Sequence, residues 1–253
     1  MAALTGRVAL VTGCGKSNGV GYATALRLAH DGADVAIHGR PNAEDDTREL
    51  GRLIAGFGRR ALRVTGDLTK ENDIVSLVDV AFEHFGRIDI LVNNAAVAGP
   101  LKPLADLKKN DWEEALSVNL RAPLFCTREC ARIMTAQRSG SIVNVVSGVE
   151  AGALNEALVY AATKSALVAL TKTLAEDLRA KGVRVNAVAP GLIESPIGMA
   201  LREKAGRRVR GEGTARKEAA TAAGSPEDVG SAVAFLASDD ASHITGQVVR
   251  LAE

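Results

Sequence analysis

Residues 8–21 read Val-Ala-Leu-Val-Thr-Gly-Cys-Gly-Lys-Ser-Asn-Gly-Val-Gly, an apolar strand followed by a glycine-rich turn and the start of a helix. Glycines let the backbone turn tightly and approach a pyrophosphate, and a helix start offers free N–H groups and a positive dipole end. A glycine turn without a ligand is the alternative at this point. The predicted phosphate-binding residues are Gly13, Gly15, Lys16, Ser17, Asn18, Gly19, Val20 and Gly21.

Short apolar segments alternate with longer amphipathic ones on both sides of this turn. The predicted strands are residues 7–12, 34–39, 61–65, 88–92, 141–146, 184–188 and 247–251. The predicted helices are residues 20–31, 44–57, 70–85, 111–137, 155–181 and 226–237. Nearly continuous apolar strands are typical of a parallel sheet covered on both faces. We therefore expect an α/β fold with one Rossmann-type, doubly wound parallel sheet, helices on both faces, and a single domain over residues 1–253.

One segment interrupts this alternation. Residues 194–224 are rich in Arg, Lys, Gly and Ala and lack a strong hydrophobic face, which predicts a mobile flap over the substrate.

The bulk composition is that of an ordinary globular protein. The 253 residues are 47% hydrophobic and 3% aromatic with a net charge of +1, which argues against nucleic acid as a partner. No apolar stretch approaches the ~18 residues that cross a bilayer, and no leader precedes the first strand, so we expect a cytoplasmic protein without a membrane partner. Cys14, Cys126 and Cys130 form no disulfide framework, and no companion ligands make them a metal site.

The end of the second predicted strand indicates which dinucleotide fits. It reads His38-Gly39-Arg40, with Gly39 where a carboxylate would bind the ribose 2′-OH of NAD(H). Arg40 can pair with a 2′-phosphate and Lys16 can add a second cation, so NADP(H) is favoured while NAD(H) stays possible. The alternative is that both bases are simply solvated.

Further motifs follow in an order that resembles the short-chain dehydrogenase/reductase family over essentially the whole length. They are Asp67 with Leu68, Asn93-Asn94-Ala95-Ala96, Asn119, Ser147, Tyr160-Ala161-Ala162-Thr163-Lys164, Pro190-Gly191, Ile193 and Ser195. The resemblance implies that Asn119, Ser147, Tyr160 and Lys164 are catalytic. It implies that the cofactor contacts Asp67, Leu68, Asn94, Ala95, Ala96, Tyr160, Lys164, Pro190, Gly191, Ile193 and Ser195.

The residue types explain the chemistry that the resemblance implies. Tyr160 and Lys164 are four apart, so they share one face of a helix. Tyrosine has a pKa near ~10 and is a poor base at neutral pH, and a nearby ammonium should lower that pKa. Tyr160 would move the proton, Ser147 would hold the substrate oxygen, Lys164 would also bind the nicotinamide ribose, and Asn119 would support a water chain. The hydride belongs to the nicotinamide.

Three departures from the family pattern limit the resemblance. The glycine turn carries two more residues than usual between Gly13 and Gly19, which leaves the role of each glycine open. Ala96 stands where the family has glycine. The family often ends in Asp-Gly-Gly after the last strand, and this sequence ends Val248-Val249-Arg250-Leu251-Ala252-Glu253, so the resemblance does not extend to the contacts of that tail.

Within the family, the pattern is most similar to 3-oxoacyl-acyl-carrier-protein reductases. Arg138 and Lys181 fall where those reductases place cations that dock the carrier protein. The flap also carries more cations than anions, which favours an acidic carrier protein or a CoA ester as the partner. Its cations are Arg202, Lys204, Arg207, Arg208, Arg210, Arg216 and Lys217, and its anions are Glu203, Glu212 and Glu218. A solvated basic surface is the alternative. Two other functions stay possible: a reductase of another ketone, a sugar or a steroid-like compound, and a non-catalytic scaffold protein.

The helices at 111–137 and 155–181 predict a homo-oligomer. The resemblance implies that this oligomer is a tetramer.

Overall fold

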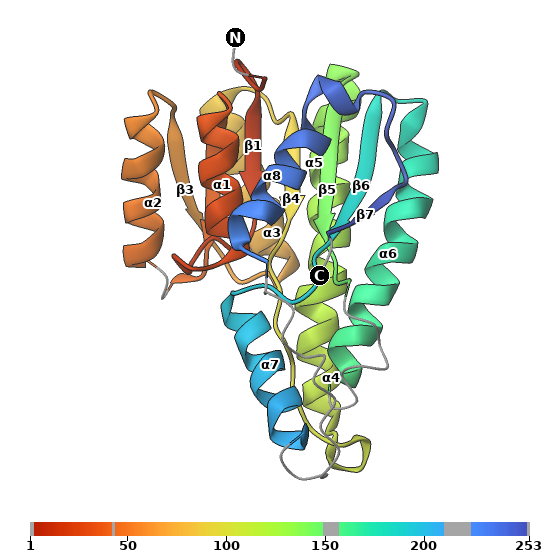
Figure 1. The fold of residues 1–253 in the computed structure, drawn as a ribbon. Coiled ribbons are helices and arrows are strands. Elements are labelled where there is room, and N and C mark those ends of the chain that lie inside the picture. Colours follow the sequence, from red (N-terminus) through yellow and green to blue (C-terminus); the bar gives the residue numbers. More distant parts are fainter. Residues whose placement is uncertain (1–2, 42–43, 149–156, 210–223, 252–253) are drawn as a thin grey trace.

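The structure is a computed structural model, and it describes residues 3–41, 44–148, 157–209 and 224–251. A seven-stranded sheet runs in the order β3-β2-β1-β4-β5-β6-β7, and all neighbouring strands are parallel. The strands are β1 (Val8–Val11), β2 (Asp34–Gly39), β3 (Ala61–Thr65), β4 (Ile90–Asn93), β5 (Gly140–Val145), β6 (Val183–Ala189) and β7 (Val248–Arg250). The predicted α/β, doubly wound parallel sheet is confirmed (Figure 1).

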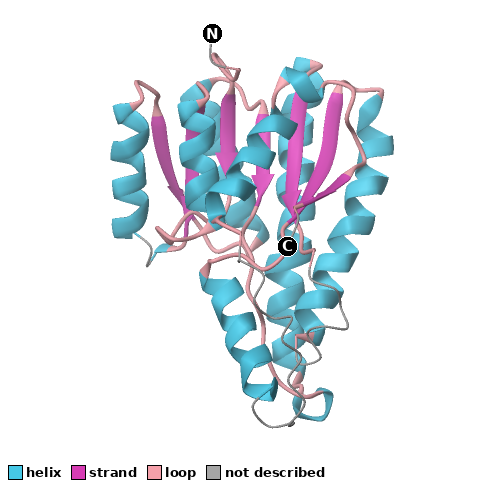
Figure 2. Cartoon of the chain, viewed as in Figure 1, coloured by secondary structure: helices cyan, strands magenta, loops and turns pink. Residues whose placement is uncertain are grey.

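Helices cover both faces of this sheet (Figure 2). The helices are α1 (Val20–His30), α2 (Glu44–Gly56), α3 (Glu71–Phe85), α4 (Lys109–Leu116), α5 (Ala122–Gln137), α6 (Leu158–Arg179), α7 (Pro196–Val209) and α8 (Pro226–Ala237). One apolar core lies under α1, α2 and α8, and it includes Leu28, Ile54 and Val233. A second lies under α3, α5 and α6 and includes Leu77, Met134 and Leu178. In the described part of the chain, no helix is both long and apolar enough to cross a membrane.

The sequence predicted one helix over residues 111–137, and this prediction is wrong in one respect. A π-helical turn, Ser117–Arg121, separates α4 from α5. A single wider turn inserts one residue without ending the apolar pattern, so periodicity does not reveal it. Asn119 lies in this turn.

The flap is also more regular than its sequence suggested. Its first part forms α7, which lies beyond the carboxyl ends of the strands (Figure 1). Leu201 on α7 is 4% exposed and packs with Ala157 and Tyr160, so this helix has a buried contact that the weak apolar pattern did not predict. Residues 210–223 of the flap lie outside the described part.

Candidate active site

A cavity of about 780 Å³ lies at the carboxyl ends of the strands. The strand order reverses between β1 and β4, and crevices at such a reversal are where open parallel sheets bind ligands. Each loop after β1 to β6 contributes to its lining, represented in strand order by Gly13, Arg40, Asp67, Asn94, Ser147 and Pro190.

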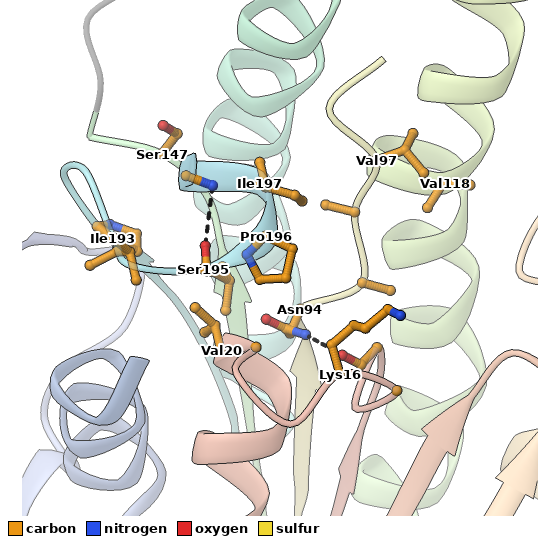
Figure 3. Close-up of a pocket in the computed structure, with 18 of the residues that line it drawn as sticks. Lys16, Val20, Asn94, Val97, Val118, Ser147, Ile193, Ser195, Pro196 and Ile197 are labelled. Carbon is orange, nitrogen blue, oxygen red and sulfur yellow. Dashed lines mark hydrogen bonds between the residues drawn. The ribbon is translucent and has the colours of Figure 1, made fainter. Parts of the chain in front are cut away.

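Most of the predicted site residues line this one cavity. They are Gly13, Gly15, Lys16, Gly19, Val20, Arg40, Asp67, Leu68, Asn94, Ala95, Ala96, Ser147, Tyr160, Lys164, Pro190, Gly191, Ile193 and Ser195. The predicted residues that do not line it are Ser17, Asn18, Gly21 and Asn119. Figure 3 shows Val97 and Val118 on the side of the cavity opposite to Ile193.

The glycine turn is held against the loop after β4. Gly13 has a φ of +77°, and a Cβ there would lie 2.7 Å from the Cα of Ala95. Asn94 Nδ2 donates to the carbonyls of Thr12 at 2.8 Å and Gly13 at 3.1 Å. A Cβ on Gly21 would collide with Asn94 and the Gly13 carbonyl. Gly13 and Gly21 are therefore the two glycines whose missing side chains permit this packing.

The two extra residues of the turn are absorbed at its tip. The side chains of Lys16, Ser17 and Asn18 are exposed, and the Gly19 N–H donates to the Lys16 carbonyl at 2.9 Å. The added length therefore forms an outward turn and leaves the Gly13–Gly21 contact in place. This geometry explains why Gly13 and Gly21 are glycines; which glycine contacts a cofactor stays a prediction.

His38 is a lining residue that the sequence did not single out. Its side chain is 2% exposed, and its ring accepts from the Gly13 N–H at 3.2 Å through Nδ1. Burial lowers the pKa of His38, a hydrogen bond to Gly66 opposes that shift, and the charge of Arg40 adds to it. Sequence reasoning missed His38 because one histidine at the end of an apolar strand is most simply a core residue.

Charges of both signs line the cavity beyond β2 and β3. Arg40 is exposed, and Asp67 receives hydrogen bonds from the Thr69 N–H at 3.0 Å and the Thr69 hydroxyl at 2.8 Å. These bonds lower the pKa of Asp67 and keep it ionised. Asp46 on α2 lines the same cavity.

Tyr160 and Lys164 lie on α6 at the floor of the cavity. Tyr160 is 7% exposed and hydrogen-bonded with Ser147, which follows β5. Lys164 is 4% exposed, and its Nζ donates to the Val145 carbonyl at 2.6 Å. The same Nζ lies 5.8 Å from the centre of the Tyr160 ring. A phenol, a hydroxyl and an amine thus converge from a helix and the adjoining strand end.

Burial controls the ionisation of this pair. It raises the pKa of Tyr160 from 10.0 to about 12, and the hydrogen bond with Ser147 offsets part of the rise. Burial also lowers the pKa of Lys164 from 10.5 to about 8. The lowered tyrosine pKa expected from the sequence is not found, because desolvation of the phenolate is the larger effect. This arrangement holds Tyr160 as a phenol at neutral pH.

Asn119 lies behind the wall of the cavity. Its Oδ1 accepts from the Val97 N–H at 2.8 Å, and its Nδ2 donates to the Val97 carbonyl at 2.9 Å and to Thr163 Oγ1 at 3.1 Å. The Thr163 hydroxyl in turn donates to the Tyr160 carbonyl at 2.8 Å. The side chain therefore ties the loop after β4 to the helix that carries Tyr160. A supporting role in a water chain stays a prediction.

The wall above Tyr160 is apolar. Val97 and Val118 come from the β4 side, and Ile193, Ile197 and Leu201 come from the β6 side and α7. Ile193 also pairs with Gly224 in a parallel bridge, so the two ends of the flap meet at its base.

The cations predicted to dock a carrier protein are not part of this cavity. Arg138 caps α5 immediately before β5, and Lys181 pairs with Asp177 at 3.1 Å immediately before β6. Both therefore lie at the amino ends of strands whose carboxyl ends face Tyr160. On one chain they cannot flank the reacting centre. The structure does not describe the side chains of the flap cations, which are Arg202, Lys204, Arg207, Arg208, Arg210, Arg216 and Lys217.

The cysteines are buried and separate from this chemistry. Burial raises the pKa of the Cys126 thiol to about 12, and it raises that of Cys130 well above its usual value. Among the side chains that the structure describes, no group of His, Cys, Asp and Glu could hold a metal ion.

Comparison with known proteins gives this site a family. A family model described as enoyl-(acyl carrier protein) reductase matches residues 13–251. Cis-4-hydroxycyclohexanecarboxylate dehydrogenase of Sinomonas cyclohexanicum is 38% identical over 253 residues, covering 96% of this chain and 94% of that protein. The 3-oxoacyl-acyl-carrier-protein reductase FabG of Thermotoga maritima is 36% identical over 248 residues, covering 97% and 96%.

Solved structures agree with the sequence relatives. An NAD⁺-bound xylitol dehydrogenase superposes with a TM-score of 0.85 at 31% identity, covering 98% of each chain. A blue fluorescent protein in complex with NADPH also gives 0.85 at 31% identity, covering 98% of this chain and 97% of that one. The chain belongs to the short-chain dehydrogenase/reductase family. It is an oxidoreductase of a family that binds nicotinamide cofactors.

The described residues fit such a cofactor. The turn lacks side chains at Gly13 and Gly21, where a Cβ would strike its neighbours, and α1 begins directly after the turn. The cavity continues from this turn past Arg40 in one direction and to Tyr160 in the other. The cavity therefore connects the glycine turn with Tyr160 in one space.

Proposed function

We propose that this protein is an NADP(H)-dependent oxidoreductase that interconverts a carbonyl and a secondary alcohol. The observation that carries the proposal is the convergence of Tyr160, Ser147 and Lys164 in the cavity that begins at the glycine turn. A bound nicotinamide supplies or accepts the hydride.

The protein supplies the proton and the position of the reacting oxygen. In reduction, Tyr160 Oη donates its proton to the carbonyl oxygen, while Ser147 Oγ holds that oxygen by a hydrogen bond. Lys164, when protonated, stabilises the phenolate that remains. Tyr160, whose burial raises its pKa to about 12, carries its proton at neutral pH and is therefore ready to act as the donor.

We propose that Arg40 makes NADP(H) the preferred cofactor. Arg40 directly follows Gly39, and its guanidinium lines the cavity. An acid at the position of Gly39 would repel a 2′-phosphate, whereas the guanidinium can pair with it. The contribution of Asp46 has the opposite sign, since its carboxylate disfavours a phosphate in the same cavity. The preference is therefore a balance between the cations Arg40 and Lys16 and the carboxylates Asp46 and Asp67, all of which line the cavity.

For the substrate we propose a 3-oxoacyl thioester. FabG of Thermotoga maritima, one relative, is named a 3-oxoacyl-acyl-carrier-protein reductase. The apolar wall of Val97, Val118, Ile197 and Leu201 suits an acyl chain beside the reacting carbonyl. A second candidate is a cyclic hydroxy acid or its ketone, because another relative is named a cis-4-hydroxycyclohexanecarboxylate dehydrogenase and the same apolar wall suits a ring.

A substrate panel tests these proposals together. NADPH oxidation is followed with acetoacetyl-CoA, 4-oxocyclohexanecarboxylate, simple ketones and sugars, with crotonyl-CoA as the enoyl control. We expect turnover of at least one carbonyl and the highest kcat/KM for acetoacetyl-CoA. A highest kcat/KM for the cyclic keto acid would select the second candidate, and turnover of crotonyl-CoA alone would refute the carbonyl chemistry.

We further propose that residues 1–253 work as one nucleotide-binding domain in which 194–224 covers the substrate. The protein is proposed to be a cytoplasmic homotetramer. In such an assembly, Arg138 and Lys181 could face the substrate entrance of a neighbouring subunit, which one chain alone does not allow.

A further inference from the structure

His38, on β2, joins the loops that follow the two neighbouring strands β1 and β3. Its Nδ1 accepts from the Gly13 N–H at 3.2 Å in the turn after β1. Its Nε2 lies 3.1 Å from the Gly66 carbonyl in the loop after β3. Its own backbone carbonyl, near the end of β2, accepts from the Cys14 N–H at 2.8 Å.

These contacts require one protonation state of the ring. The Gly13 N–H can only donate, so Nδ1 must be the unprotonated nitrogen. The Gly66 carbonyl can only accept, so Nε2 must carry the hydrogen. A second proton on Nδ1 would face the Gly13 N–H and break that bond. The two partners therefore select the neutral ring with its hydrogen on Nε2.

We propose that His38 is a positioning residue for the dinucleotide. While its ring is neutral, His38 ties the glycine turn to the loop after β3, which contains Gly66 and Asp67. When the ring is protonated, the turn is released. This inference rests on the proposed function, because the turn and the loop are the parts expected to hold the cofactor. Asn94 fastens the same turn from the β4 side, so His38 is the matching tie from the β2 side.

The charged groups around His38 come from each element packed near it. Arg40 at the end of β2 disfavours a charged ring, and burial acts in the same direction. Lys16 of the turn and Asp46 of α2 line the same cavity. Asp67 is ionised, and Asp73 of α3 accepts from the Asp67 N–H at 2.8 Å beside Gly66. The pKa of His38 lies below 6.5, so the tie is complete at neutral pH and is lost under acidic conditions.

Binding of NADH as a function of pH tests this role. NADH is the probe because a 2′-phosphate titrates near ~6 and would obscure the histidine. Dissociation constants are measured by nicotinamide fluorescence between pH 5 and pH 8 for the wild type, His38→Asn and His38→Phe. Asn places Oδ1 where Nδ1 stands and cannot titrate, whereas Phe keeps the ring and offers no acceptor.

We expect wild-type affinity to fall as the pH falls. His38→Asn should show no such fall, and at neutral pH it should bind between the wild type and His38→Phe, since it keeps the acceptor for Gly13 and loses the contact with Gly66. His38→Phe should bind about tenfold more weakly at every pH, since the Gly13 N–H loses its partner. His30→Asn is the matched control, because His30 is exposed at the end of α1, and it should reproduce the wild-type profile. Amide exchange at Gly13 supplies a readout without cofactor: its protection factor should drop in His38→Phe and be retained in His38→Asn.

The outcomes separate this inference from the proposed function. If the wild type binds neither NADH nor NADPH, the proposed function fails, and the positioning role fails with it. If the wild type binds, and all variants match its affinity, pH profile and Gly13 protection, only the role of His38 is overturned.

Discussion

The amino group of Lys164 donates to the backbone carbonyl of Val145 at 2.6 Å, which ties α6 to the strand that leads into Ser147. Burial lowers the pKa of this lysine from 10.5 to about 8. The buried position of this lysine therefore costs stability, as is common for functional groups in dry sites.

Replacing Lys164 should make the folded protein more stable. The pKa of Lys164 falls from 10.5 to about 8 on folding, which at 1.36 kcal/mol per unit costs roughly 3 kcal/mol at pH 7. The cost is full below pH 8 and disappears as the pH rises toward 10.5, because the unfolded chain then also loses the proton. Loss of the bond to the Val145 carbonyl offsets about 1 kcal/mol of this relief, so Lys164→Met should raise the free energy of unfolding by about 1–2 kcal/mol at pH 7 in urea titrations, and give no gain near pH 10.5.

Lys172→Met, an exposed lysine on the same helix, is the control and should change the stability little at either pH. A Lys164→Met variant that is less stable at pH 7, or equally shifted at both pH values, would contradict the burial account.

The cofactor preference should follow two opposite charges. Arg40→Ala should weaken NADPH by about 1.5–3 kcal/mol, the range for a charge-assisted hydrogen bond, and leave NADH little changed. Asp46→Asn should strengthen NADPH, since it removes a negative charge from the same cavity. Dissociation constants for both cofactors check this, and a wild type that prefers NADH, or an equal loss for both after Arg40→Ala, would refute it.

The α4–α5 and α6 surfaces should join subunits. Trp112, Leu124 and Leu158 are 41%, 37% and 41% exposed on these helices. Burying such side chains between chains would stabilise an oligomer. We expect light scattering at micromolar concentration to give four times the 26.3 kDa of one chain, and Trp112→Glu with Leu124→Glu to lower that mass. A wild type that scatters as a monomer would exclude the assembly.

The basic flap should steer an anionic thioester. Exposed charges are screened over ~8–10 Å at physiological ionic strength, so kcat/KM for acetoacetyl-CoA should fall as salt rises. A small neutral ketone should show no comparable loss, and Arg207→Glu with Arg208→Glu should reproduce the high-salt value at low salt. Equal salt dependence of both substrates would leave the flap as a solvated surface.

The sheet and most cavity-lining residues could be predicted because strand ends and glycine spacing are local signals. The shared cavity of Gly13, Arg40 and Tyr160 follows from the parallel sheet, which brings the carboxyl ends of its strands to one edge. Three features could not be read in this way. The π-turn at Asn119 leaves the apolar pattern intact, the tie made by His38 depends on partners distant in sequence, and the pKa of Tyr160 depends on burial.

Substitution of the proposed proton donor tests the central claim most directly. Tyr160→Phe keeps the ring and removes only the hydroxyl that Ser147 bonds. NADPH binding should stay close to that of the wild type, because the hydroxyl acts at the reacting oxygen. Reduction of the best carbonyl substrate should fall in kcat by about 10²–10⁴ or more. A Tyr160→Phe protein that retains half the wild-type kcat would contradict the assignment of Tyr160 as the proton donor.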